Sequence, residues 1–479
     1  MSFTSIQYLV FFLIAVSIYF LLPKKIKNYW LLICSYYFYM CWNIKYALLM
    51  LFSTFITYLS GILIGKSKSK KSKNIFVFLS LFINLGILFI FKYYTFVIDI
   101  INPLLDNIFR LKIPDTLNLL LPAGISFYTF QALSYTLDVY RNDVKVEKNF
   151  FTYALFVSFF PQLVAGPIEK SKDLLNQFNF EHKFSFDNLH HGLLLIAIGF
   201  FYKLVIADRA AIVVNQVYNN LDEYVDGGGF YLIFATILFA IQIYFDFNSY
   251  STIAKGSAEV MGFKLSKNFN MPYFATSIKD FWRRWHISLS SWFKEYLYFP
   301  LGGSRKGFIR TQINTLIVFL ISGLWHGANL TFVIWGALHG LYQVIGNILF
   351  KNKVKSNSLF IKFLKVIITF ILVDFAWIFF RANTLKDSVL ILVNLLDFGM
   401  SIDFNLIGLT YLELLILFTS LFIVLLLELI SIKVDIEKWF YKRNIIFRWL
   451  FYYILLFFII IFGIYGPLYD ASEFIYFQF

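Results

Sequence analysis

A stretch of forty residues, 311–350, contains no Asp, Glu, Lys or Arg but carries two histidines, His326 and His339. So many uncharged, mostly apolar residues cannot form a soluble core helix and must enter a bilayer. An ionisable ring there loses its hydration, so it is rare unless it faces the protein interior or a water-filled cavity. Because imidazole exchanges protons near neutral pH, His326 is the first candidate for chemistry in this sequence.

His326 follows Arg310, which marks a membrane boundary, by about sixteen residues, or about 24 Å of straight helix against a hydrocarbon core of about 30 Å. We therefore expect His326 to lie well inside the membrane. A small-xxx-small spacing that permits close helix packing occurs twice in this stretch, at Gly323 and Gly327 and at Gly336 and Gly340.

Forty residues exceed one span, so the sequence predicts a helix break near Gly327-Ala328-Asn329, where Gly and Asn favour a turn. Broken backbone in a membrane must be buried in protein or line a cavity, where a histidine can meet a substrate. The alternative is that His326 only hydrogen-bonds between packed helices. On a continuous helix His339 would lie about 220° around the axis from His326, and we interpret it as structural.

Asp246 follows another apolar run and is either a functional acid or a helix-end residue paired with an arginine. The two prolines and the glycine of residues 159–167 predict that a further helix is broken there. Three histidines, His182, His190 and His191, lie near acidic residues. Because neither their spacing nor a convergent carboxylate is typical of a metal site, we predict no metal.

The segment 255–311 breaks the apolar pattern, because it carries ten lysines and arginines among many aromatic residues. Four apolar residues recur there at helical spacing: Trp285, Leu289, Trp292 and Tyr296. We interpret the segment as lying at the membrane interface, with its apolar face in lipid or protein and its cations toward headgroups. His286 lies in this segment, and an interfacial histidine is usually solvated.

The composition predicts the fold class. The 479 residues are 59% hydrophobic and 15% charged, whereas soluble domains carry about 25% charged residues. The apolar runs read as helices, without the alternating ten-residue pattern of a membrane barrel. We predict an all-α polytopic membrane protein with about eleven or twelve transmembrane helices plus re-entrant or interfacial helices.

The net charge of +14 is best explained by basic loops that orient the chain in the membrane, and not by nucleic acid. One basic loop follows the first apolar run, which we interpret as a retained helix and not a signal peptide. The other, residues 66–73, has five lysines. Placing both loops in the cytoplasm puts the N-terminus outside. Cys34 and Cys41 lie too far apart along one predicted helix to form a disulfide.

Six stretches together resemble the membrane-bound O-acyltransferase (MBOAT) family, in particular its alginate O-acetyltransferase-like bacterial branch. They are LPAGISFYTFQALSYTLDVYR (121–141), FFPQLVAGPI (159–168), QIYFDFNSYSTIAKGSA (242–258), MGFKLSKNFNMPYFATSIKDFWRRWHISLSSWFKEYLYFPLGGSR (261–305), SGLWHG (322–327) and FIYFQF (474–479). One departure is visible. The family commonly has DFSGYSD where this chain has DFNSYST, so the glycine and the second aspartate are lost while Asp246 is kept.

The resemblance implies one MBOAT domain over residues 1–479. It comprises N-terminal helices in 1–112, a catalytic core in 113–345 with the interfacial basic segment 255–311, and C-terminal helices in 346–479. It also implies that His326 is the central catalytic residue and His286 the second. The candidates for substrate or donor binding are Trp325, Asn329, Asp246, Arg283, Arg284 and Arg305. Together with Lys306, the arginines Arg283, Arg284 and Arg305 could meet the phosphates of coenzyme A, or equally anionic lipid.

The activity implied is O-acyl transfer from a cytosolic thioester to hydroxyls of an extracytoplasmic polysaccharide, an alginate-like exopolysaccharide or peptidoglycan. The donor would be acetyl-CoA or another acyl thioester, with no bound cofactor. The implied setting is the bacterial cytoplasmic membrane, with an SGNH-hydrolase-like extracytoplasmic partner. Two alternatives stay open: D-alanyl transfer to teichoic acid, and a transporter or flippase in which His326 relays protons.

Overall fold

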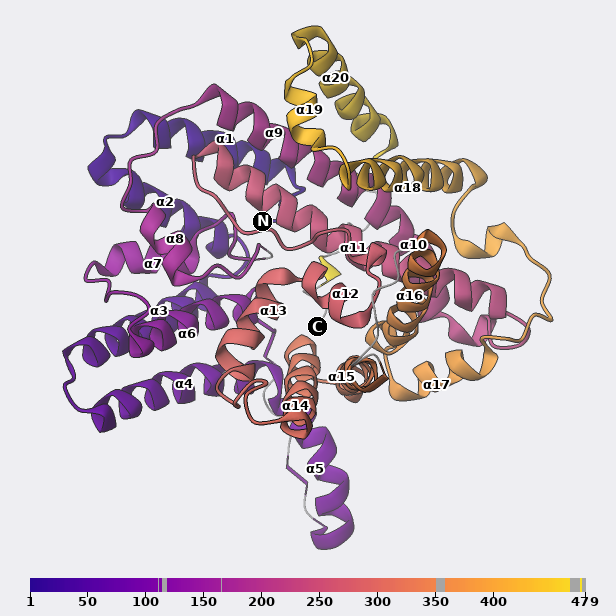
Figure 1. Ribbon diagram of the computed structural model, residues 1–479, viewed down its shortest axis with the longest axis horizontal. Helices are drawn as coiled ribbons and strands as arrows, with labels where there is room; N and C mark the ends of the chain where they lie inside the picture. Colours follow the sequence, from indigo (N-terminus) through magenta and orange to yellow (C-terminus); the bar gives the residue numbers. More distant parts are fainter. Residues whose placement is uncertain (111, 114–118, 165, 350–357, 466–473, 476–479) are drawn as a thin grey trace. The chain divides into compact units, whose positions relative to one another are not determined.

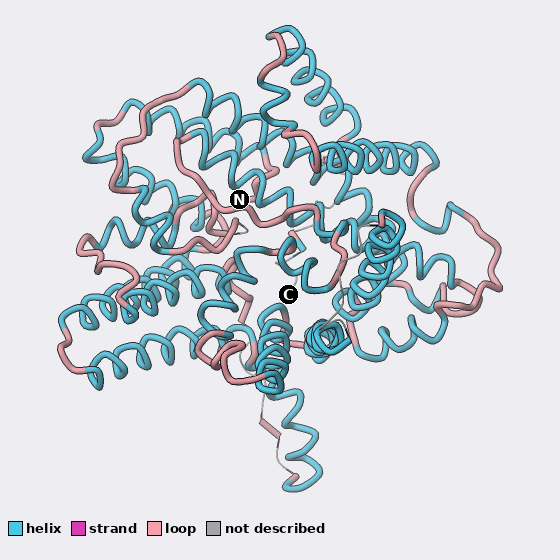
Figure 2. Tube along the Cα trace, viewed as in Figure 1, coloured by secondary structure: helices cyan, strands magenta, loops and turns pink. Residues whose placement is uncertain are grey.

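The computed structural model describes residues 1–479 except 111, 114–118, 165, 350–357, 466–473 and 476–479. Within the described ranges the regular elements are all helices, and no strand occurs among them (Figure 2). The predicted all-α polytopic class is therefore confirmed. The last four residues of the terminal FIYFQF motif lie outside the described part of the chain.

The described residues form two compact units. The first comprises Met1–Leu193, Ala254–Lys267 and Ser291–Pro300, and the second comprises Leu194–Ile253, Asn268–Ser290 and Leu301–Phe479. Three helices have residues in both units: α9 (Phe186–Phe200), α11 (Gly229–Val260) and α13 (Ile287–Phe293). The interpretation of residues 1–479 as one MBOAT domain stays a prediction.

The first unit contains helices from the N-terminal part of the chain and one π-helix. They are α1 (Ile6–Leu21), α2 (Lys24–Met40), α3 (Ile44–Lys66), α4 (Lys70–Lys92), α5 (Tyr94–Phe109), α6 (Ile125–Arg141), α7 (Phe150–Ser158), α8 (Ser171–Gln177) and η4 (Lys294–Tyr298). Because α7 ends at Ser158, the break predicted for residues 159–167 is confirmed.

The second unit contains the histidines of interest. Its helices are η1 (Phe201–Ala207), α10 (Asp208–Asn219), η2 (Leu221–Glu223), η3 (Pro272–Phe274), α12 (Ile278–Arg284), α14 (Phe308–His326), α15 (Leu330–Leu349), α16 (Leu359–Arg381), α17 (Leu385–Asn394), η5 (Phe404–Ile407), α18 (Tyr411–Ser431), α19 (Ile436–Tyr441) and α20 (Ile445–Phe462). Of these, η1 is π-helical, a form often found at functional sites.

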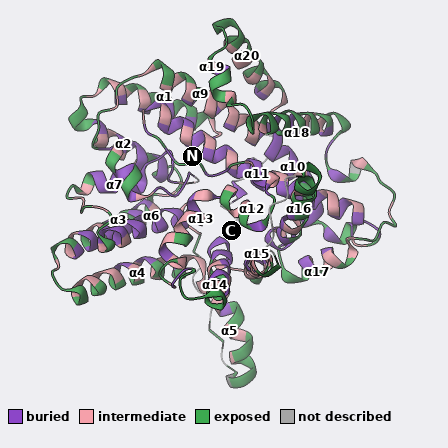
Figure 3. Cartoon of the chain, in the orientation of Figure 1, coloured by how far each residue is buried: buried purple, intermediate pink, exposed green. Residues whose placement is uncertain are grey.

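Nine helical stretches among the described residues are long and apolar enough to cross a membrane. Others, such as α1 and α6, are shorter than a typical span of about 20 residues. The predicted number of crossings therefore stays a prediction. Exposed apolar residues predominate along α18 and α20, whereas α11 is mostly buried (Figure 3). Such surfaces on α18 and α20 suit contact with lipid.

In the first unit, α3, α4 and α6 lie side by side (Figure 1). Buried polar side chains link them. The Ser53 hydroxyl donates to Asn84 Oδ1 at 2.5 Å between α3 and α4, and Ser80 and Thr136 pair between α4 and α6. Hydrogen bonds between helices hold membrane bundles together, because the lipid offers these groups no alternative partner.

Candidate active site

His326 is the last residue of α14, and Gly327 after it is extended with a φ of −159°. Helix α15 begins at Leu330. The predicted break at Gly327-Ala328-Asn329 is therefore confirmed. His326 lies at the end of the helix away from Arg310, so the two helices form a hairpin whose turn adjoins the candidate catalytic ring.

Two glycines allow α14 and α15 to approach closely. A Cβ atom on Gly323 would lie 2.3 Å from the Phe332 carbonyl oxygen, and one on Gly336 would lie 2.4 Å from the Phe319 carbonyl oxygen. Any larger side chain would therefore push the backbones apart. The small-residue spacing in the sequence has this physical basis.

Aromatic side chains surround the His326 ring, which is only 2% exposed. The rings of Trp325 and Trp335 each lie edge-on to it, with centroids 4.9 Å away. Phe380 of α16 approaches at 5.4 Å. Such walls restrict the rotation of the imidazole and keep bulk water from its faces.

His286 joins α12 to α13 in the left-handed backbone region, with a φ of 41°. Non-glycine residues adopt this conformation at an energetic cost, and such residues cluster at functional sites. The side chain is fully buried, with Phe247 at 4.6 Å and Trp325 at 6.0 Å between ring centroids. Burial lowers the pKa of His286 to about 3, so its ring is neutral at physiological pH. The expectation of a solvated interfacial histidine is wrong.

In the basic segment the helix breaks at Trp285 and His286, between α12 and α13, so Trp285 precedes the helical stretch that carries Leu289, Trp292 and Tyr296. Trp285, Leu289 and Tyr296 are buried within the protein. The indole of Trp292 stacks on Phe130 with centroids 3.8 Å apart. The apolar face therefore packs largely against protein and not lipid.

Asn268, which did not stand out in the sequence, holds the His286 corner in place. Its carbonyl accepts from the Ile287 amide at 2.9 Å, and its Oδ1 accepts from the Ser288 hydroxyl at 2.7 Å. Its Nδ2 donates to Ser251 Oγ on α11 at 3.1 Å. Asn268 is a positioning residue. Its position at the start of NFNMPYF (268–274), a stretch with three aromatic residues, was the only sequence signal.

Asp246 lies inside α11 and is paired with a lysine, so the helix-end interpretation with an arginine partner is wrong. Lys203 of η1 donates to Asp246 Oδ1 at 2.7 Å and also meets Asp208 at 2.8 Å. Asp246 Oδ2 accepts from the backbone amide of Ile475 at 2.8 Å. The next residue, Phe247, packs against His286, so this buried network anchors the turn of α11 that supports the histidine.

Two predicted binding residues have structural contacts of their own. Trp325 lies against both His286 and His326. Asn329 caps α15, because its Oδ1 accepts from the Thr331 amide, and its Nδ2 donates to the Asn383 carbonyl, both at 3.1 Å. Substrate contact by these two side chains stays a prediction.

The predicted phosphate-binding arginines differ in their surroundings. Arg283 and Arg305 are exposed, whereas Arg284 is paired with Asp280 at 3.1 Å. Arg305 precedes α14, and His326 ends it. The nineteen residues of this helix correspond to about 28 Å. A donor held at Arg305 by its phosphates would therefore need a long arm to bring its acyl group to His326.

His339 accepts a hydrogen bond from Trp282 Nε1 at 3.3 Å. The argument that it faces away from His326 is wrong, because the two residues lie on separate helices. Both rings contact Trp335, His339 at 5.0 Å and His326 at 4.9 Å between centroids.

The three other histidines lie in the first unit. His191 meets Glu259 at 2.7 Å, and His182 bonds to the Gln177 carbonyl at 3.0 Å. No group of three or more potential metal ligands occurs in the described ranges.

A further residue that did not stand out in the sequence is Arg381 at the end of α16. Its guanidinium donates to the side-chain oxygens of Asn215 and Asn219 on α10, at 2.9 and 3.0 Å. The preceding residue, Phe380, contacts His326. Arg381 therefore anchors to α10 the end of α16 from which Phe380 contacts His326.

The described residues form a helical membrane protein with two buried histidines, His286 and His326, and the comparisons identify its class and family. The model of the membrane-bound O-acyltransferase family matches residues 32–385. The chain belongs to this family and is a multi-pass membrane O-acyltransferase.

Three relatives indicate the range of the similarity. A probable alginate O-acetylase AlgI of Pseudomonas aeruginosa is 37% identical over 83% of this chain and 75% of its own length. A peptidoglycan O-acetyltransferase of Helicobacter pylori is 36% identical over 78% of this chain and 75% of its own. A teichoic acid D-alanyltransferase of Bacillus subtilis is more distant, 30% identical over 56% of this chain and 70% of its own.

Proposed function

We propose that this protein transfers acetyl groups from a cytosolic thioester, acetyl-CoA or a similar donor, toward hydroxyls of an extracytoplasmic polysaccharide. The observation that carries the proposal is the burial of His326 at the end of a membrane helix, within an aromatic enclosure. The acetyl group and the glycan acceptor are inferred from relatives named as alginate and peptidoglycan O-acetylases, which match most of this chain.

In this mechanism His326 is the general base. Its imidazole takes the proton of the acceptor hydroxyl while the hydroxyl oxygen attacks the thioester carbonyl carbon. The new C–O bond forms, the C–S bond breaks, and the departing thiolate receives the proton, which yields an ester and a free thiol. The neutral form of an imidazole is the form that can accept this proton.

His286 has a different role in this scheme. With a pKa near 3 it is a weak base at neutral pH, so we assign it to orienting or hydrogen-bonding the reacting groups. The alternative mechanism forms a transient acyl-histidine on His326. Trapping labelled acetyl on His326 would contradict the simple base mechanism.

The proposed setting is the bacterial cytoplasmic membrane, with the N-terminus outside because the basic loops favour the cytoplasm. The predicted extracytoplasmic partner resembles SGNH hydrolases and would receive or deliver the acetyl group. Arg283, Arg284 and Arg305 are proposed to meet the donor phosphates.

The test uses purified protein in proteoliposomes with labelled acetyl-CoA, and mass analysis of envelope glycans from cells. We expect His326→Ala to abolish acetyl transfer and glycan acetylation, while His190→Ala, which changes an exposed histidine, leaves both intact. Transfer by folded His326→Ala at the wild-type rate would refute the role of His326. Proton-coupled substrate movement without histidine-dependent transfer would favour the transporter alternative.

The second candidate is D-alanyl transfer, because one relative is named for it. Here the thioester would be on a carrier protein and the acceptor would be teichoic acid. Parallel assays with an acetyl thioester and with a D-alanyl carrier thioester separate the two. Turnover of the D-alanyl donor alone would replace the acetyl proposal.

A further inference from the structure

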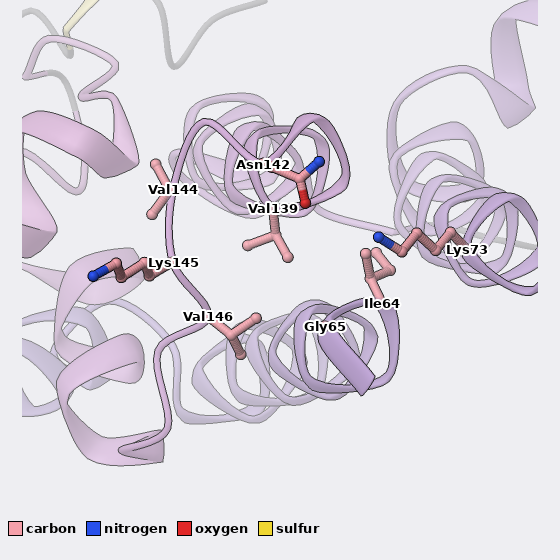
Figure 4. A pocket seen from close by; sticks show the side chains of 8 residues that line it. All are labelled: Ile64, Gly65, Lys73, Val139, Asn142, Val144, Lys145 and Val146. Atoms are coloured by element: carbon pink, nitrogen blue, oxygen red, sulfur yellow. The ribbon is translucent and has the colours of Figure 1, made fainter. Parts of the chain in front are cut away.

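The first unit contains a pocket of about 270 Å³ where the ends of α3 and α6 meet the loop before α7. Its lining residues are Ile64, Gly65, Lys73, Val139, Asn142, Val144, Lys145 and Val146 (Figure 4). Apolar side chains form its walls, and two lysines and one amide supply its polar groups. None of these eight described residues carries a carboxylate.

Two positively charged side chains, Lys73 and Lys145, are among the lining residues of this pocket. Among the described residues, neither Lys73 nor Lys145 has an ion-pair partner. The Lys73 side chain extends from the start of α4 toward the carboxamide of Asn142 (Figure 4). Asn142 has a φ of 62°, a left-handed conformation that ends α6. The Lys73 ammonium and the Asn142 amide thus face a pocket with apolar walls. Such a pocket suits a ligand that has an anionic group and an apolar part.

Close packing makes the pocket part of the fold. A Cβ atom on Gly65 would lie 2.5 Å from Val146 Cγ2. The glycine therefore allows the loop before α7 to pack against the end of α3. Val139 and Ile64 are buried. The pocket therefore has a fixed floor beneath its polar groups.

The pocket lies beside the adjoining ends of two helices that could cross a membrane. Helices α3 and α4 are both long and apolar enough to cross a bilayer, and the turn between them belongs to the stretch KSKSKKSK, residues 66–73. Clusters of four to eight basic residues next to a membrane helix are typical of binding to anionic lipid headgroups. Each lysine near such a surface contributes about 1 kcal/mol.

We propose that this pocket binds the phosphate of an anionic phospholipid headgroup, with Lys73 as its cation and Asn142 as a hydrogen-bond donor. Val139, Val144 and Val146 contact the glycerol and upper acyl carbons. The site is independent of His326 and of the acyl donor. A soluble phosphate compound, such as coenzyme A, shares the chemistry but would not need the apolar walls.

The test is native mass spectrometry of the purified chain titrated with phosphatidylglycerol or phosphatidylcholine. We expect Lys73→Gln to weaken binding of phosphatidylglycerol by roughly fivefold, from about 1 kcal/mol for one lysine. The matched control is Lys70→Gln, which removes the same charge from the same basic stretch outside the pocket and should have little effect. Val144→Phe, which keeps Lys73 but fills the space, should also weaken binding.

Three outcomes would overturn the proposal. The first is equal loss of phosphatidylglycerol binding in Lys73→Gln and Lys70→Gln, which would indicate nonspecific attraction. The second is equal binding of phosphatidylcholine and phosphatidylglycerol by the wild-type chain. The third is displacement of the lipid by coenzyme A at similar concentration, which would assign the pocket to a soluble phosphate. Thermal unfolding of each variant confirms that it is folded before titration.

Discussion

The indole of Trp325 lies 6.0 Å from the ring of His286 and 4.9 Å from the ring of His326, measured between centroids. One side chain therefore connects the two candidate catalytic histidines, which are forty positions apart in the chain. Because Trp325 is 4% exposed, its indole is held by packing and can keep the two rings in a constant relationship. The site depends on the α12–α13 corner as much as on α14.

Substitution of Gly323 by alanine should disrupt the α14–α15 hairpin, because the new Cβ would meet the Phe332 carbonyl at 2.3 Å. We expect a loss of about 1–3 kcal/mol from overpacking and a fall in acyl transfer, measured by thermal unfolding and by the acetyl-CoA assay. The matched control is Gly346→Ala on α15, where no atom of the described residues lies within 4 Å of the new Cβ. A Gly323→Ala protein as stable and active as Gly346→Ala would contradict this account.

Removal of Lys203 should leave Asp246 and Asp208 as buried carboxylates without their cation. Breaking a buried ion pair by removing one partner costs about 3–5 kcal/mol, so Lys203→Met should lower the unfolding temperature sharply. The double variant Lys203→Met/Asp246→Asn should be less destabilised than the sum of the single changes. Strict additivity in this cycle would show that the two residues are not coupled.

Asn268→Ala should loosen the corner that carries His286. The Ser288 hydroxyl and Ser251 Oγ each lose a partner, and an unsatisfied buried polar group costs about 1–3 kcal/mol. We expect the turnover number to fall more than the Michaelis constant for the donor rises, because the reacting groups are misplaced. An effect on donor binding alone would point to a role for Asn268 other than positioning.

The buried His286 makes stability depend on pH in a defined direction. Its folded pKa of about 3 lies below the ordinary value of about 6.5, so the unfolded state binds more protons between these two values. The free energy of unfolding should therefore decrease as the pH falls below about 6.5, by up to about 1.4 kcal/mol per pH unit. Thermal unfolding of wild-type protein and His286→Gln at pH 7.5, 5.5 and 4.5 measures this. Parallel curves would show that His286 is not the source of the pH dependence.

Local sequence patterns were sufficient to predict the membrane helices and the helix break after His326. An uncharged run longer than one span must turn within or at the edge of the bilayer, and Gly327 and Asn329 are where a turn is favourable. The same local chemistry identified Gly323 and Gly336 as close-packing positions. These properties need no knowledge of which helices are neighbours.

Only the tertiary structure decided the surroundings of the histidines. The corner at His286 is buried because Phe247 and Trp325 come to it from other helices. Lys203 and Asp246 lie 43 positions apart, and no local pattern predicts that they pair. Apolar side chains in lipid-spanning helices have no preferred partner, so the sequence determined which residues enter the membrane, while packing among the helices determined which of them meet.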